Sequence, residues 1–327
     1  MWPNHADTCV LSYPLELADR TWDNVGLLLG NSHLPNSPGK HVVLVTNDLT
    51  PDVAEEAISK QASVIVTYRA GPPSNTTPAL PRLLKPASDP FIFRGLKAIT
   101  LDDPQQKTLI RLVQANVAVY SPHTAVDAAK GGLNDWLADM AAAAAAAEGI
   151  STHRSVVKPI ATPGVGSEGV GYGRLVKFER PVEVRRLLHC LAAGLGPHHP
   201  GTARPRPFMV ARPRGAARET VSSVAVCAGS GWSVLGDCDA DVYFMGETAH
   251  HNANHAAMSG RWVITTFHSN SERYFLQTRL VEQLAGLLKK TVPDADVVAS
   301  ERDRDPFDVI MVDADDKELP DLSHLRT

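Results

Sequence analysis

The sequence lacks the features that mark membrane and secreted proteins. No apolar run approaches the roughly 20 residues that span a bilayer, so no membrane segment is expected. The N-terminal MWPNHADTC has neither the basic start of a secretory signal nor an arginine-rich amphipathic pattern. Only four cysteines occur and none forms a CxxC pair, which argues against a disulfide framework and a zinc-thiolate site. We therefore expect a reducing compartment, by default the cytoplasm, with the nucleus and the mitochondrion left open.

Strong charge of either sign is also missing. The formal net charge is −4, the pI is about 6.3 and no basic run occurs, so there is no general electrostatic case for nucleic-acid binding. What is present is an ordinary globular composition, with 43% hydrophobic residues over 327 positions. That length gives room for two domains or for one large α/β domain.

Strand and helix patterns alternate along the chain. Residues 42–46 and 64–68 are predicted strands, and Thr50 followed by Pro51 predicts the start of a helix to about Lys60. This β-α-β unit predicts a parallel sheet with a right-handed crossover. The fold class is therefore α/β, with mixed or parallel sheets and flanking helices.

Three parts are predicted. Residues 1–148 form an N-terminal α/β domain with strand 117–121, helices 104–116 and 134–148, and a proline-rich insertion at 69–89. Residues 149–220 form a glycine- and proline-rich connecting region with one strand (174–178) and one helix (182–195). Residues 221–327 form a C-terminal α/β part with strands at 223–227, 241–245 and 262–266, a helix from 268 to about 290, and a closing strand near 309–312.

The stretch 263–273 carries the main chemical signal. A buried strand ends there, and His268 and Glu272 follow four residues apart at the predicted first turn of a helix. This spacing places their Cβ atoms about 5–6 Å apart on one helix face, where both can hold one divalent ion. The alternative is that His268 and Glu272 are solvated neighbours that hold no ion, because such a pair is common on surface helices.

A second unit of the same form strengthens the metal interpretation. Residues 117–121 are a predicted strand, and His123 and Asp127 follow it with the same spacing. Open α/β sheets bind ligands at adjacent strand ends, so the two units are expected to meet there.

Seven motifs occur in one order and cover nearly the whole chain except 69–89 and most of 150–215. They are WDNVG at 22–26, NDLT at 47–50, YSPHTAVDAA at 120–129, NDWL at 134–137, GSG at 229–231, GE at 246–247 with His250 and His251, and HSNSER at 268–273. Together they resemble the NIF-three family (NGG-one-interacting factor three), whose members are also labelled GTP cyclohydrolase type-two homologues. The resemblance implies an α/β protein that assembles into a toroidal homohexamer with a paired divalent-metal site facing its interior.

Residue by residue, the resemblance implies that Asp127, His268 and Glu272 are metal ligands, with His123 beside them as a further or supporting ligand. Mixed imidazole and carboxylate donors suit zinc, manganese or iron, and a carboxylate can bridge two ions about 3.5–4 Å apart. Such a pair can generate hydroxide near neutral pH, which is the requirement for metal-assisted hydrolysis.

Two functions remain open at this point. The first is a hydrolase-like enzyme acting on a small phosphorylated or nucleotide-like substrate, with the glycines of 229–231 helping to hold it. The second is a non-enzymatic regulatory protein that binds a partner in transcription regulation and has an impaired metal site. Glu247, His250 and His251 are either supporting groups or solvent-facing residues, so they are left out of the ligand set.

The sequence departs from the family pattern after Tyr68. The family has a histidine pair, or tyrosine and histidine, followed by proline and an apolar pair. Here Arg69 follows Tyr68, and the PFIF continuation begins only at Pro90. Arginine has no acceptor and cannot replace a histidine ligand, so two ions per subunit are expected only if the histidine is restored.

Our hypothesis for residues 69–89 is translation of an unremoved intron. The codon of Arg69 can supply C directly before GU, where the intron would begin. The codon of Asp89 can supply AC directly after AG, where the intron would end. Excision would join C to AC as one histidine codon between Tyr68 and Pro90 and would keep the reading frame. The alternative is a genuine surface insertion that has abolished or altered metal binding.

Sequencing of the mature transcript across codons 68–90 tests this hypothesis. We expect a message in which the tyrosine codon is joined through one histidine codon to the codon of Pro90. A message that retains codons 69–89 would show that the insertion is real.

Overall fold

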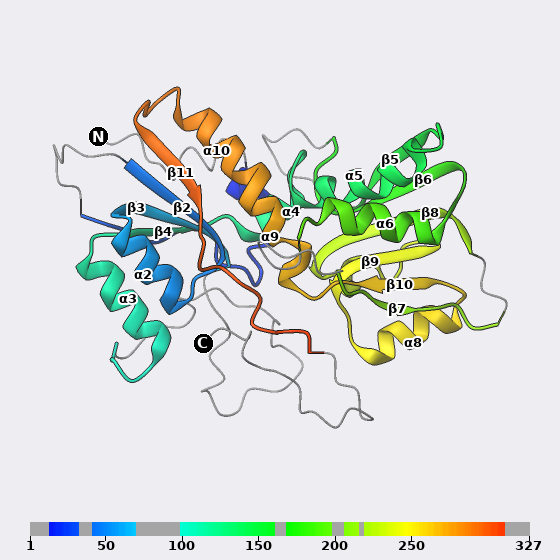
Figure 1. The fold of residues 1–327 in the computed structure, drawn as a ribbon, viewed down its shortest axis with the longest axis horizontal. Helices are drawn as coiled ribbons and strands as arrows, with labels where there is room; N and C mark the ends of the chain where they lie inside the picture. Colours follow the sequence, from blue (N-terminus) through cyan, green and yellow to red (C-terminus); the bar gives the residue numbers. More distant parts are fainter. Residues whose placement is uncertain are drawn as a thin grey trace.

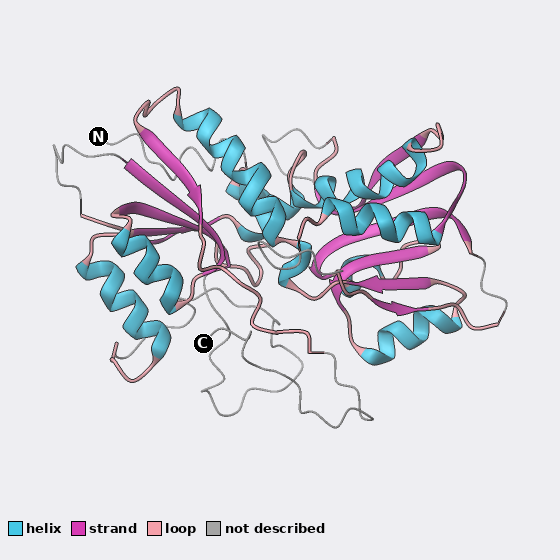
Figure 2. Cartoon of the chain, in the orientation of Figure 1, coloured by secondary structure: helices cyan, strands magenta, loops and turns pink. Residues whose placement is uncertain are grey.

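The computed structural model describes residues 13–32, 41–69, 99–160, 168–197, 206–215 and 219–310. Within these ranges the chain forms two sheets that lie side by side, each with helices packed on its faces (Figures 1 and 2). This arrangement confirms the predicted α/β class with mixed sheets and flanking helices. None of the helices in the described ranges combines the length and the apolar composition that crossing a bilayer requires.

The first sheet has the strand order β1-β4-β3-β2-β11. Its strands are β1 (Gly26–Leu29), β2 (His41–Asp48), β3 (Ala62–Arg69), β4 (Ala118–Ser121) and β11 (Ala295–Ala299). All neighbours pair in parallel except β1, which runs antiparallel to β4. Helix α2 (Pro51–Ser59) connects β2 to β3 and begins where the Thr50 hydroxyl accepts a hydrogen bond from the Val53 amide at 3.3 Å. The predicted β-α-β unit is therefore confirmed.

The second sheet has the order β5-β6-β8-β9-β10-β7. Its strands are β5 (Thr152–Pro159), β6 (Gly171–Glu183), β7 (Met209–Ala211), β8 (Thr220–Ser230), β9 (Val242–Glu247) and β10 (Trp262–Thr265). Strands β8, β9 and β10 are parallel, and β5, β6 and β7 join antiparallel. The carboxyl ends of β8, β9 and β10 therefore lie along one edge.

Three apolar clusters hold these layers together. Helix α2 and helix α3 (Pro104–Gln114) cover one face of the first sheet through residues such as Val53 and Leu112. Helix α7 (Trp232–Leu235) and helix α8 (His250–Met258) cover the outer face of the second sheet. The largest cluster joins the remaining faces of both sheets with α5 (Leu133–Ala146), α6 (Val184–Gly194) and α10 (Val281–Leu288), so one continuous core links the sheets.

Most predicted elements are present, and three expectations are corrected. The predicted helix from 268 is instead a 3₁₀ turn (Ser269–Ser271), a short helix α9 (Arg273–Phe275), a π turn (Leu276–Leu280) and α10. The interruption falls at Glu272, whose φ of −124° lies outside the helical range and separates the 3₁₀ turn from α9. The connecting region 149–220, predicted to contain one strand and one helix, also contains β5, β7 and the first residue of β8.

The predicted closing strand near 309–312 is also wrong for residues 309 and 310, which form no strand. In the preceding segment, the amides of Glu301 and Arg302 donate to the Glu56 carboxylate at 3.0 and 3.2 Å. These two amides are therefore bonded to a side chain and not to a strand, and the last strand of the described residues is β11. Of the predicted insertion at 69–89, only Arg69 lies within the described residues.

Candidate functional site

The predicted site residues come from strand ends of both sheets. Helix α4 (His123–Ala128) follows β4 directly and carries His123 and Asp127. His268 and Glu272 follow β10 and bracket the short 3₁₀ turn. Arg69 ends β3 and pairs with Glu272, while its neighbour Tyr68 bonds Asp127. The two predicted units therefore meet where the two sheets face each other.

Glu272 lies at the centre of this meeting point. Its side chain is only 1% exposed, and its Oε1 lies 3.4 Å from Nε2 of His268. Its Oε2 accepts a short hydrogen bond from Nη2 of Arg69. The His268 ring is held from its other side, because Nδ1 lies 2.8 Å from Oε1 of Glu247. Glu247 therefore fixes the orientation of His268 and supports it, a role that the sequence left open.

Asp127 lies beside Tyr68. The Tyr68 hydroxyl donates a 2.6 Å hydrogen bond to Oδ1 of Asp127. The residue Asp127 is half-buried, and protein surrounds its carboxyl closely enough that burial raises its pKa to about 7. The hydrogen bond and the nearby His123 oppose this shift, and the charge of Glu272 adds to it. Asp127 can therefore hold or release a proton near neutral pH.

His123 is fixed by a residue that sequence reasoning missed. Nδ1 of His123 lies 2.8 Å from Oδ1 of Asp23, and the same carboxylate accepts a hydrogen bond from the Thr124 amide at 3.2 Å. The edges of the Tyr68 and Trp22 rings meet the imidazole at centroid distances of 5.0 and 5.8 Å. His123 also has a φ of +25°, a strained conformation of the kind found at functional sites. The only sequence signal for Asp23 was its place in the WDNVG motif.

Gly229 and Ser271 allow the backbone of β8 to lie close to His268 and Glu272. The Gly229 amide donates to Oγ of Ser271 at 2.9 Å, and that hydroxyl donates to the His268 carbonyl at 2.7 Å. A Cβ atom on Gly229 would lie 2.7 Å from Nε2 of His268 and 2.9 Å from Oε1 of Glu272. Only glycine leaves this space free. Because its amide is already bonded, Gly229 does not offer that amide to a substrate.

The donor types fit a divalent ion, but they do not close around one. Among the described residues there is no group of three or more histidine, cysteine, aspartate and glutamate side chains placed to hold a metal. Oε2 of Glu272 is directed at Arg69, and Oδ1 of Asp127 is directed at Tyr68. The residues that could supply donors after rearrangement are Asp127, His268 and Glu272, with His123 beside them.

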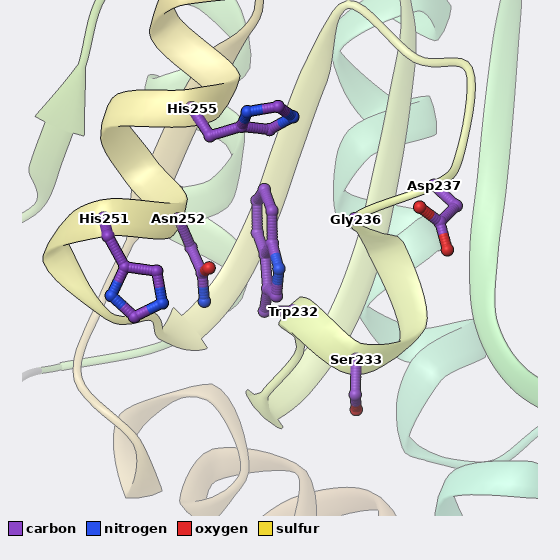
Figure 3. A pocket seen from close by; sticks show the side chains of 7 residues that line it. All are labelled: Trp232, Ser233, Gly236, Asp237, His251, Asn252 and His255. Atoms are coloured by element: carbon purple, nitrogen blue, oxygen red, sulfur yellow. The ribbon is translucent and has the colours of Figure 1, made fainter.

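A separate hollow lies on the α7 and α8 side of the second sheet. It has a volume of about 580 Å³ and contains none of the four predicted ligands; its lining is Trp232, Ser233, Gly236, Asp237, His251, Asn252 and His255. Figure 3 shows the Trp232 ring facing His251, Asn252 and His255 of α8. His250 and His251 are both exposed, which favours the solvent-facing alternative for them.

The chain is similar to known proteins along most of its length. Residues 9–70 and 88–306 match the family model described as Duf34/NIF3 (NGG1p interacting factor 3), which leaves 71–87 unmatched, inside the predicted insertion. The chain is 41% identical to Protein NIF3 homolog of Schizosaccharomyces pombe, over 90% of this chain and 93% of the relative. It is 34% identical to NGG1-interacting factor 3 of Saccharomyces cerevisiae, over 91% and 93%.

The fold also matches solved structures. The crystal structure of a Bacillus cereus protein related to NIF3 superposes with a TM-score of 0.67 at 20% identity, covering 94% of this chain and 98% of that one.

Substitution of Gly229 by alanine should distort the pair of His268 and Glu272. Gly260 provides a matched control: its φ of +78° is as left-handed as the +60° of Gly229, but a Cβ there meets nothing within 4 Å. Both variants carry a backbone penalty of about 1–2 kcal/mol. Gly229→Ala should lose about 1–3 kcal/mol more free energy of unfolding through overpacking, measured by urea denaturation. Equal losses would contradict the close approach.

The Asp127 carboxyl should make stability depend on pH in metal-free protein. Between its usual pKa of 3.8 and the folded value of about 7, the native state keeps a proton that the unfolded state releases. This stabilising contribution is complete below pH 3.8 and is lost as the pH rises to about 7. The free energy of unfolding of wild type relative to Asp127→Asn should fall by at most about 1.4 kcal/mol per pH unit in this window. Urea denaturation in chelator measures it; parallel pH profiles would contradict the assignment.

Proposed function

The chain belongs to the Duf34/NIF3 family, and on this premise we propose that Asp127, His268 and Glu272 bind divalent metal, with His123 beside them. The observation that carries the proposal is the convergence of two strand-end units, seen in the pairing of Tyr68 with Asp127 and of Arg69 with Glu272. Imidazole and carboxylate donors together suit zinc, manganese or iron. The contact of Glu247 with Nδ1 leaves Nε2 of His268 available, which is the usual way a metal-binding histidine is oriented.

The activity we propose is hydrolysis of a small phosphorylated or nucleotide-like substrate. A bound divalent ion would supply activated water near neutral pH, and a pair of ions is expected only if residue 69 is histidine. In the metal-free protein the pKa of Asp127 is about 7, so its carboxyl must release a proton near neutral pH before it can bind an ion. Tyr68 holds that carboxyl in place through its hydroxyl. The family resemblance further supports a toroidal hexamer as the proposed assembly, with the site facing its interior.

A second candidate is a non-enzymatic regulatory protein with an impaired metal site. Two observations favour it. The Arg69 guanidinium already neutralises Glu272. The Saccharomyces cerevisiae relative is named for interaction with NGG1, which supports a protein partner in transcription regulation for this chain as well.

Removing single ligands separates these candidates. We expect Asp127→Asn and Glu272→Gln to bind Zn²⁺ or Mn²⁺ about tenfold or more weakly than wild type when titrated to millimolar metal, because each removes a donor charge. Glu55→Gln is the control, since Glu55 forms only an exposed pair with Arg111. Isothermal titration gives the affinities, and circular dichroism checks the fold.

Hydrolysis of a panel of phosphate esters and nucleotides should fall in the same two variants. Metal affinities equal to wild type in both variants would contradict the metal site. Absence of metal-dependent turnover in wild type, with unchanged binding of the NGG1-type partner by the ligand variants, would favour the regulatory candidate.

A further inference from the structure

Arg69 occupies the carboxylate edge of the candidate metal site. Its side chain is 14% exposed and its Nη2 donates to Oε2 of the buried Glu272. Its guanidinium carbon also lies 5.8 Å from the centre of the Tyr68 ring. An ion pair removed from water in this way is much less screened than a surface pair, so the positive charge of Arg69 acts strongly on anything that approaches Glu272.

The position of Arg69 is fixed by the backbone. It is the last residue of β3, and it pairs with Asp48 of β2 in the parallel ladder. The Arg69 carbonyl accepts a 3.3 Å hydrogen bond from the Leu49 amide. The strand end therefore holds the guanidinium at the site, and displacing it requires either a new side-chain conformation or local loss of the ladder.

Charges of alternating sign continue from Glu272 through Arg69. Nε of Arg69 lies 3.9 Å from Oδ1 of Asp48, and the other oxygen of Asp48 lies 3.8 Å from Nη2 of Arg273. Nε of Arg273 is 3.3 Å from Oδ2 of Asp303. Within the described residues Nε of Arg69 has no hydrogen-bond partner, although it is buried. Arg69 thus has charged partners in Glu272 and Asp48, but its buried Nε lacks a hydrogen bond, so its surroundings do not satisfy all of its donors.

We propose that Arg69 is a built-in cation that excludes divalent metal from Glu272 and thereby sets how tightly the site binds it. The guanidinium takes one of the two oxygens of Glu272, and its fixed charge repels a second cation at the same carboxylate. Burial alone would lower the pKa of Arg69, but the facing charges of Glu272 and Asp48 outweigh it and leave the pKa above the usual arginine value, so the guanidinium stays charged. This inference rests on the proposed metal function of Asp127, His268 and Glu272, and it concerns the chain with arginine at residue 69, the alternative to the intron hypothesis.

Three substitutions at Arg69 test the inference with Zn²⁺ and Mn²⁺ alone as probes. Arg69→Gln removes the charge and keeps much of the length, so its metal affinity should rise about tenfold or more, the scale on which groups beside metal ligands act. Arg69→His adds a donor and should bind at least as tightly. Arg69→Lys keeps the charge and should stay close to wild type. Arg111→Gln, at an exposed pair away from the site, is the control.

Melting temperatures with and without metal show whether the Arg69→Gln variant is folded and whether the ion stabilises it. Without metal, Arg69→Gln leaves Glu272 buried without its cation, so its melting temperature should be lower than that of wild type. Saturating Mn²⁺ should raise it by more than it raises wild type, because the ion replaces the missing charge.

The outcomes distinguish this inference from the proposed function. If wild type and Arg69→Gln bind the ion equally tightly, and adding Asp127→Asn removes binding from each of them, the role of Arg69 is overturned and the metal site stands. Tight binding by Arg69→Gln that persists in the Arg69→Gln/Asp127→Asn double variant would place the ion elsewhere and overturn the metal site itself. Tight binding by Arg69→Gln that is lost in the double variant supports both.

Discussion

The site depends on one buried carboxylate. Glu272 is almost completely removed from water, and an ionised carboxylate in that position must have a positive partner close by. In this chain Arg69 supplies that charge, and the His268 ring borders the other oxygen. A divalent ion would satisfy the same requirement. Arginine and metal are thus alternative solutions to one electrostatic problem, and residue 69 decides between them.

The fold creates this problem by bringing two sheets together at their strand ends. Tyr68 and Arg69 end β3, and α4 begins just after β4. Gly229 lies near the end of β8, and His268 follows β10. Asn134 ties the halves together: its Nδ2 donates to the Asp127 carbonyl at 3.0 Å, and its Oδ1 accepts from the Ala228 amide at 3.0 Å. The position of the carboxylates therefore follows from backbone contacts between the sheets as well as from the ligand side chains.

Much of this could be predicted from the sequence because local patterns carry it. The strands before His123 and His268 are short apolar runs, and each histidine with its carboxylate recurs at a fixed spacing. The contact of Arg69 with Glu272 joins positions 203 apart in the chain, and no local pattern encodes it. The helical segment expected from His268 is present but irregular, because Glu272 departs from helical dihedral angles with a φ of −124°, which apolar periodicity does not report. Asp23 was missed because its partner His123 lies 100 residues away.

The most direct test of the central claim is anomalous diffraction at the manganese edge, from crystals of wild type and of Arg69→Gln grown in the same concentration of MnCl₂. The account predicts a peak bordered by Asp127, His268 and Glu272 in Arg69→Gln, and a much weaker one or none in wild type, where the guanidinium stays on Glu272. A full peak at this place in wild type, with Arg69 turned away, would contradict it.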